Sequence, residues 1–229
     1  MALRRRRLTG WRIAERMRMP AATVYRVLRR AGLHRLSALE PKPPVRRFVR
    51  ERAGELVHLD TKPLGRIQGV GHRMTGDRRD RSRGVGWEYA HVAIDDASRL
   101  AYVEILPDQR GETAVGFFER ARLWFAKRRI PIERVMTDNG SCYVARRFRQ
   151  ALRRRGIRQI RTRPYRPQTN GKAERFIQTM LRGWAYARPY GTSNQRTRAL
   201  PKWLRYYNEQ RPHRGLAGLT PALQAQRTR

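Results

Sequence analysis

Apolar stretches with strand-like and helix-like spacing alternate along most of the chain, and their order limits the folds open to it. The first predicted strand is at 55–64, and residues 87–106 form two more strands that flank a turn at 95–98. Helices and strands then alternate: a helix at 112–128, a strand from 132 to Asp138, a helix at 143–155, a strand near 157–161 and a helix from 171. Three strands followed by alternating helices and strands predict an α/β domain. Its sheet is mixed and five-stranded, and helices flank it.

The first forty residues predict a separate, all-α region. Residues 10–18 and 21–31 have helical spacing, and Met19-Pro20 between them suits a tight turn before a second helix. Two short helices around a turn suggest a helix-turn-helix, although an ordinary basic helical hairpin fits the same pattern. In a helix-turn-helix the second helix enters the major groove, and here it would present Thr23, Tyr25, Arg26, Arg29 and Arg30 to DNA.

Composition shifts mark the expected domain boundaries. Residues 40–52 contain three closely spaced prolines and little periodicity, as a linker does. The predicted organisation is a helix-turn-helix region at 1–39, this linker, a catalytic core at 53–222 and a basic tail at 223–229. Within the core, the Gly- and Arg-rich stretch 65–86 has no hydrophobic period and is predicted to be a mobile basic loop.

The charge of the chain points to a polyanionic partner. There are 53 Lys and Arg against 18 Asp and Glu, giving a net charge of +35. Nucleic acid would neutralise this charge. The single cysteine, Cys142, cannot form an internal disulfide, and no Cys/His set has zinc spacing. No signal peptide or membrane-spanning run is found, so we expect a protein of the reducing cytoplasm that does not contact membrane.

Three of the few acids stand where they could converge. Asp60 lies inside the first strand, Asp138 ends the fourth, and Glu174 is in the first turn of a late helix. Crowded carboxylates repel one another unless a cation binds them, and hard oxygen ligands favour Mg²⁺ or Mn²⁺. Two such ions about 3.5 to 4 Å apart suit in-line displacement at phosphorus. Singly, each acid has an ordinary structural explanation, as do Asp95 and Asp96 in their hairpin turn.

Other residues are expected to have structural roles. His58 is expected to be a packed or solvent-side strand residue, Cys142 a loop or buried thiol, and His213 a structural contact near the C-terminus. Core packing is expected for the tryptophans Trp11, Trp184 and Trp203, and for two helical stripes: Val115, Phe118, Ala121, Leu123 and Phe125, and Ala173, Phe176, Ile177, Met180, Leu181 and Trp184.

Three segments resemble one known family. The stretches "TDNGSCY" and "RPYRPQTNGKAERF" surround Asp138 and Glu174, and "YYNEQRPHRGLAGLTP" follows later in the chain. They are similar to segments of bacterial insertion-sequence transposases, which share a catalytic core with retroviral integrases. The resemblance runs from about residue 51 to residue 222. It implies a ribonuclease-H-like fold and a polynucleotidyl transferase whose Asp60, Asp138 and Glu174 are catalytic and bind two Mg²⁺ or Mn²⁺ ions.

The resemblance also implies partners and a reaction. The reaction would be cleavage at the ends of a mobile DNA element followed by attack of the freed 3′-hydroxyl on target DNA. Both DNAs are double-stranded, the protein would act as a homo-oligomer on them, and it would be associated with the bacterial nucleoid. Residues that could contact DNA near the site are Asn139, Tyr165, Gln168, Asn170 and Lys172.

Two alternatives stay open at this point. Relatives often carry a further helix-turn-helix upstream, so the chain could be a truncated relic that binds DNA without catalysis. A ribonuclease-H-like nuclease that hydrolyses DNA without joining it would share the fold and the metal ions.

Overall fold

The computed structural model describes residues 1–40, 49–69, 85–162 and 170–229, and it divides into two compact units, residues 1–48 and 49–229. Most of the predicted linker and most of the predicted basic loop 65–86 lie outside the described residues. Among the described residues, no helix is long and apolar enough to cross a membrane.

The N-terminal unit is built from short helices, as predicted. They are α1 (Ala2–Arg5), α2 (Gly10–Met17), α3 (Ala21–Arg30) and the single 3₁₀ turn η1 (Leu36–Ala38). Thr9 caps α2 by accepting a hydrogen bond from the backbone N–H of Arg12, and Arg18 ends the helix in the left-handed conformation. A small core of Ile13, Ala14, Val24 and Leu28 joins α2 to α3.

The packing prediction for Trp11 is wrong. Its side chain is 66% exposed, because the buried face of α2 is set by Gly10, Ile13 and Ala14. Gly10 lies against the ring of Tyr25, and a Cβ at that position would come within 2.7 Å of the ring. Helical spacing alone did not show which face of α2 packs on α3 and which adjacent face, carrying Trp11, stays exposed.

The second unit contains the predicted mixed five-stranded sheet, in the order β3-β2-β1-β4-β5. The strands are β1 (Val57–Gly65), β2 (Trp87–Asp95), β3 (Ala101–Leu106), β4 (Arg134–Thr137) and β5 (Arg158–Arg161). The first three pair antiparallel, whereas β4 runs parallel to both β1 and β5. The central strand β1 therefore has an antiparallel neighbour on one side and a parallel neighbour on the other.

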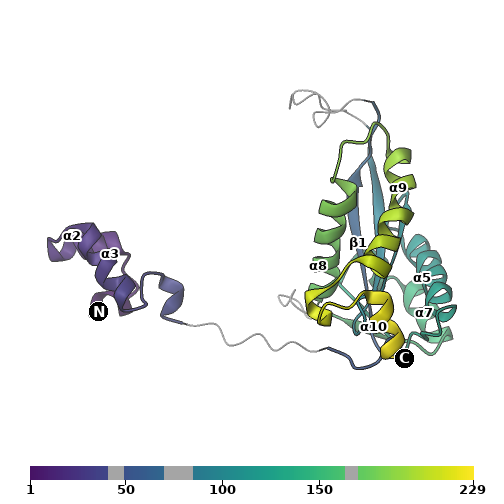
Figure 1. The fold of residues 1–229 in the computed structure, drawn as a ribbon, viewed down its shortest axis with the longest axis horizontal. Helices are drawn as coiled ribbons and strands as arrows, with labels where there is room; N and C mark the ends of the chain where they lie inside the picture. The colour runs from purple at the N-terminus through teal and green to yellow at the C-terminus, as the bar shows by residue number, and fades with distance from the viewer. Residues whose placement is uncertain (41–48, 70–84, 163–169) are drawn as a thin grey trace. The chain divides into compact units, whose positions relative to one another are not determined.

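Helices cover both faces of this sheet, which gives three layers with two cores (Figure 1). On one face, Val57 and Leu59 of β1 pack with α5 (Gly111–Ala126), α6 (Ser141–Val144) and α7 (Arg146–Arg154). On the other, Val92 and Ile94 of β2 pack with α8 (Gly171–Met180) and α9 (Ser193–Arg205). Because side chains alternate along a strand, His58 and Asp60 lie on the α8 face.

Two details of the helices differ from the prediction. Leu123 is 51% exposed, and the buried face of α5 consists instead of Ala114, Phe117, Phe118, Ala121 and Phe125. The helix predicted at 143–155 is two helices, α6 and α7, because Ala145 between them has an extended backbone. The stripe predicted on the late helix is confirmed, with Leu181 only partly buried.

The C-terminal residues fold onto the sheet instead of forming the predicted basic tail. After α8 the chain continues through η3 (Leu181–Ala185), α9, η4 (Tyr206–Gln210), η5 (Arg214–Leu216) and α10 (Pro221–Arg227). Ala225 is buried in the core on the α5 face, and the Thr228 carbonyl accepts a 2.8 Å hydrogen bond from the Ala53 N–H. The end of the chain thus closes on the segment that precedes β1.

Candidate active site

Asp60 lies on β1, and Asp138 directly follows the neighbouring parallel strand β4. The β1–β4 register pairs Val57 with Val135 and His58 with Met136. Asp60 and Asp138 each follow this last pair by two residues, and residues two apart on a strand share a face. The parallel ladder thus directs both carboxylates to one region beyond the end of β4, on the α8 face.

Glu174 reaches the same region from α8. The helix packs on the sheet through Ala173, Phe176 and Ile177, which leaves the neighbouring Glu174 on an exposed flank. The pKa of Asp60 is raised to about 7, chiefly by burial and also by the negative charges of Asp138 and Glu174, against a hydrogen bond from Thr61 that lowers it. Asp138 and Glu174 are therefore both close enough to act on Asp60 electrostatically.

Two of the three carboxylates, those of Asp60 and Asp138, accept hydrogen bonds from neutral donors. Asp60 Oδ1 accepts a 2.7 Å hydrogen bond from the Thr61 N–H, and its Oδ2 lies 3.4 Å from Asn170 Nδ2. Asp138 Oδ1 accepts a 2.9 Å hydrogen bond from the Gly140 N–H. Within the described ranges, none of the three acids forms an ion pair with Lys or Arg, although the chain carries 53 such residues.

The three acids do not converge on one point as they stand. Among the described residues, no group of three Asp, Glu, His or Cys side chains lies close enough to hold a metal ion. The chemistry of the set nevertheless suits a hard divalent cation, since in the described part of the chain its carboxylate oxygens form no ion pair with Lys or Arg.

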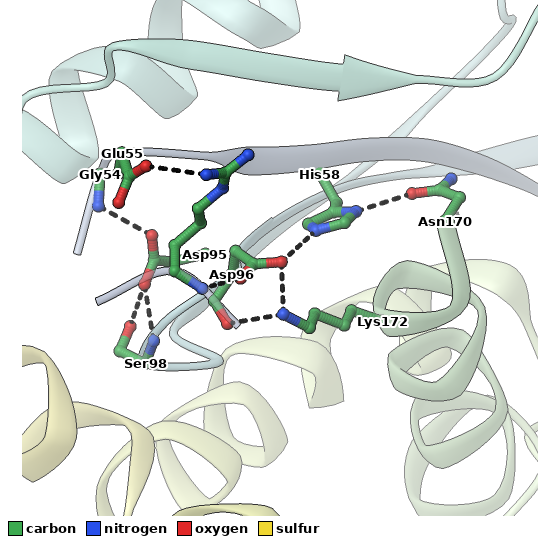
Figure 2. A network of polar contacts seen from close by, with 9 residues as sticks. Gly54, Glu55, His58, Asp95, Asp96, Ser98, Asn170 and Lys172 are labelled. Carbon is green, nitrogen blue, oxygen red and sulfur yellow. Dashed lines mark hydrogen bonds and ion pairs between the residues drawn. The ribbon is translucent and has the colours of Figure 1, made fainter. Parts of the chain in front are cut away.

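Beside the acids lies a buried polar network that the sequence did not predict (Figure 2). His58 Nε2 is 2.7 Å from Asp96 Oδ1, and His58 Nδ1 is 3.0 Å from Asn170 Oδ1. Lys172 forms an ion pair with Asp96, whose other oxygen accepts a 2.7 Å hydrogen bond from the Arg50 N–H. Although Asp96 is buried, these donors hold its pKa below the usual range.

Asp95 has the structural role predicted for the hairpin turn. Its carboxylate accepts hydrogen bonds from the N–H and the hydroxyl of Ser98, at 2.7 and 2.6 Å, and from the Gly54 N–H at 2.8 Å. The two neighbouring acids of the turn thus differ. Asp95 fixes the hairpin and the chain before β1, whereas Asp96 faces His58 and Lys172.

The residues predicted to contact DNA divide by location. On α3, Thr23 is half-buried, and the exposed members are Tyr25, Arg26, Arg29 and Arg30. Asn139 is exposed, and its amide donates a 3.0 Å hydrogen bond to the Thr162 carbonyl. Asn170 and Lys172 belong to the polar network, and Tyr165 and Gln168 lie outside the described residues.

The single thiol is not a candidate nucleophile. Cys142 is buried in α6, as predicted, and burial raises its pKa to about 11. A thiol with this pKa is protonated at neutral pH and therefore unreactive.

Two family models match the chain. Both are described as integrase core domains, one matching residues 50–167 and the other residues 155–221. The first alone covers more than half of the 229 residues. Together they include all three acids and the whole polar network.

Curated relatives match over parts of their length. An uncharacterized protein of Caenorhabditis elegans is 32% identical over 134 residues, which are 58% of this chain and 10% of that protein. The putative transposase InsD for insertion element IS2E of Escherichia coli is 35% identical over 86 residues, covering 38% of this chain and 39% of the relative. The chain therefore spans well under half the length of these relatives.

Solved structures share the fold. The catalytic core of HTLV-2 integrase in complex with magnesium has a TM-score of 0.55 and 13% identity, covering 76% of this chain and 97% of that one. The catalytic core of BIV integrase has a TM-score of 0.51 and 19% identity over the same shares. A chain of the simian T-cell lymphotropic virus intasome, solved in complex with PP2A regulatory subunit B56 gamma, has a TM-score of 0.55 and 16% identity, covering 89% of this chain and 70% of that one. The predicted ribonuclease-H-like fold is thus confirmed.

Proposed function

Because the chain belongs to the integrase core domain family, we propose that it is a DNA transposase that cuts phosphodiester bonds at mobile-element ends. It then joins the freed 3′-hydroxyl to target DNA. The observation that carries the proposal is the placement of Asp60, Asp138 and Glu174, where the charges of the last two act on the first. The similarity to transposases of insertion elements supports the mobile-element substrate.

Asp60, Asp138 and Glu174 are the residues that would hold two Mg²⁺ or Mn²⁺ ions. Their oxygen donors and their lack of basic partners in the described ranges suit hard cations, and the HTLV-2 integrase core binds magnesium. Such ions would activate the attacking oxygen and stabilise the leaving oxygen of an in-line displacement at phosphorus. The protein itself positions the DNA ends and supplies positive charge to their phosphates.

The rest of the chain would bind and arrange the DNA. The +35 charge suits a phosphate backbone, and α3 would present Tyr25, Arg26, Arg29 and Arg30 to a groove, with Thr23 at its edge. Asn139, Tyr165, Gln168, Asn170 and Lys172 would lie beside the reacting strand. Two DNA ends need two active sites, so we propose a homo-oligomer on DNA, on the nucleoid of a bacterial cytoplasm.

A strand-transfer assay tests this function. Labelled duplexes that carry the ends of the flanking element are incubated with Mn²⁺, supercoiled plasmid and either the wild-type protein or Glu174→Gln. Joined products are expected from the wild type and not from Glu174→Gln. Glu209→Gln, which changes another exposed helical glutamate, is the matched control and should join at the wild-type rate.

The products also decide between the alternatives. Cleaved but unjoined DNA would identify a nuclease and contradict the transferase proposal. DNA binding of equal strength by all three proteins, without cutting or joining, would identify a protein that only binds DNA.

A further inference from the structure

Asn170 stands at the N-terminus of α8, but its side chain does not cap the helix. Asn is among the best capping residues, yet no capping hydrogen bond forms here. The side chain is 4% exposed and points at β1 instead, where its oxygen faces His58 and its amide nitrogen faces Asp60. The Asn170 side chain therefore forms two contacts with β1 in place of the capping hydrogen bond of α8. Such departures are expected where a site needs a particular geometry.

Lys172 departs from the helical preference as well. A positive side chain in the first turn opposes the helix dipole. The ion pair with Asp96, which is 3% exposed, offsets this cost and ties the first turn of α8 to the β2–β3 hairpin. Lys172 also donates a 3.3 Å hydrogen bond to the Asp96 carbonyl.

His58 lies between Asp96 of the hairpin and Asn170 at the start of α8. It is 2% exposed and comes two residues before Asp60 on the same face of β1. One ring nitrogen meets Asp96 and the other meets Asn170, so the ring cannot turn without breaking a buried hydrogen bond. Asp96 is itself fixed by the Arg50 N–H. The chain of contacts runs from the hairpin through His58 and Asn170 to Asp60.

We propose that Asp96, His58 and Asn170 form a positioning relay that orients the Asp60 carboxylate and sets the distance between β1 and the start of α8. This inference rests on the proposed function, because it matters only if Asp60 and Glu174 hold the metal ions. Three of the contacts in Figure 2 join β1 or the hairpin to the turn that carries Glu174: His58 with Asn170, and Lys172 with the carboxylate and the carbonyl of Asp96. The relay therefore holds two of the three acids in a fixed relation before an ion binds.

The two ring nitrogens of His58 can be tested separately. In His58→Asn the side-chain amide takes the place of Nδ1, so the contact with Asn170 is retained and the contact with Asp96 is lost. In His58→Gln the amide takes the place of Nε2, so the contact with Asp96 is retained and that with Asn170 is lost. Asn170→Leu removes the link from the other side at similar volume. His91→Gln is the control, since His91 is also buried but lies on the opposite face of the sheet and bonds to the Asp108 carbonyl.

The first readout is Mn²⁺ affinity without DNA, measured from the electron paramagnetic resonance signal of free Mn²⁺ on the full chain. Loss of partners that orient metal ligands typically weakens binding about 10- to 100-fold. We expect a loss in this range for Asn170→Leu and His58→Gln, near-wild-type affinity for His91→Gln, and substantial recovery in His58→Asn. Strand transfer at saturating Mn²⁺ should recover in part in the weakened variants, because excess ion compensates for poor orientation.

The outcomes separate the two proposals. If Asp60→Asn abolishes Mn²⁺ binding while Asn170→Leu and His58→Gln bind like the wild type, the relay is wrong and the proposed function stands. If Asp60→Asn itself binds Mn²⁺ like the wild type, the proposed metal ligands are wrong. An equal loss in both His58 variants and in His91→Gln would show only a general need for buried histidines, and it would overturn the relay. Should Asn170→Leu not fold, the two His58 variants decide the question.

Discussion

His58 on β1 is paired in register with Met136 on β4, and this pair determines where two of the acids lie. Asp60 lies two residues further along β1, and Asp138 lies two residues after Met136, directly beyond β4, so the parallel pairing brings both acids to the end of β4. Asp60, on the strand itself, is held more rigidly than a carboxylate on a loop. Glu174 comes from a helix that packs on the same face, and the buried relay connects that helix to β1.

Replacing Asp138 with Asn should remove catalysis while leaving the fold intact. The amide oxygen can still accept the hydrogen bond from the Gly140 N–H, but the charge that would bind a cation is lost. We expect metal-dependent joining to fall by at least about 100-fold, because replacing residues that only orient metal ligands already lowers metal affinity or activity by up to that factor. The measurement is the rate of strand transfer in Mn²⁺. Asp108→Asn, at the start of α5, is the control, and equal loss in both variants would contradict a special role for Asp138.

Asp60 should make the metal-free protein less stable as the pH rises. Its pKa is raised from 3.8 to about 7, so the folded state holds a proton that the unfolded chain releases at lower pH. Stability is therefore lost between about pH 4 and pH 7, up to a limit of roughly 4 kcal/mol, which solvent near the site reduces to about 1 to 2 kcal/mol.

Asp60→Asn removes this titration. Urea unfolding without divalent ions should show the variant more stable than the wild type by about 1 to 2 kcal/mol at pH 8 and equal to it near pH 4. Mn²⁺ should stabilise the wild type at pH 8 and leave the variant unchanged. A variant less stable than the wild type at pH 8 would show that the ionised Asp60 is favourably held, and would contradict the raised pKa.

Local patterns predicted the sheet, its strand order in the chain and the three acids. Periodicity reports which residues are apolar and how they are spaced, and the strands here are clean in that respect. The same signal failed at Leu123 and Trp11, where several adjacent helical positions are apolar and only the partner element decides which face is buried.

The polar network could not be predicted in the same way. His58 and Asn170 are separated by 112 residues in the chain, and His58 and Asp96 by 38. No local rule links a strand histidine, a turn aspartate and a helix-terminal asparagine across such separations. The one available signal was that His58 and Asp60 share a strand face, which placed a buried titratable side chain beside the first acid.

Removing arginines from α3 should weaken DNA binding through the phosphate backbone. Arg29 and Arg30 are exposed in the last turn of this helix. If each contacts one phosphate, the double variant Arg29→Ala/Arg30→Ala should lower the slope of log K against log salt by about 2, because each phosphate contributes about 0.9. Fluorescence anisotropy on a labelled duplex at several salt concentrations gives the slope. Arg12→Ala on α2 is the control, and an unchanged slope in the double variant would exclude these phosphate contacts.

The stability of the second unit should depend on a buried ion pair that joins α9 to β2. Arg196 is 1% exposed and donates hydrogen bonds to Glu88 Oε1 at 2.8 Å and to the Gly65 carbonyl at 2.7 Å. Arg196→Met would leave Glu88 buried without its partner, which typically costs about 3 to 5 kcal/mol. Urea unfolding should show this loss, and the double variant Arg196→Met/Glu88→Leu should recover much of it, because removing both charges leaves neither unpaired.

An exposed pair provides the comparison for this prediction. Arg52 and Glu133 are 3.0 Å apart, and their side chains are 63% and 39% exposed. Since water screens such a pair, Arg52→Met should change the free energy of unfolding by less than about 1 kcal/mol. Equal losses in Arg52→Met and Arg196→Met would mean that burial does not set the cost of breaking the Arg196–Glu88 pair. If the double variant does not recover stability, the loss would instead come from the hydrogen bond between Arg196 and the Gly65 carbonyl, which is absent both from Arg196→Met and from Arg196→Met/Glu88→Leu.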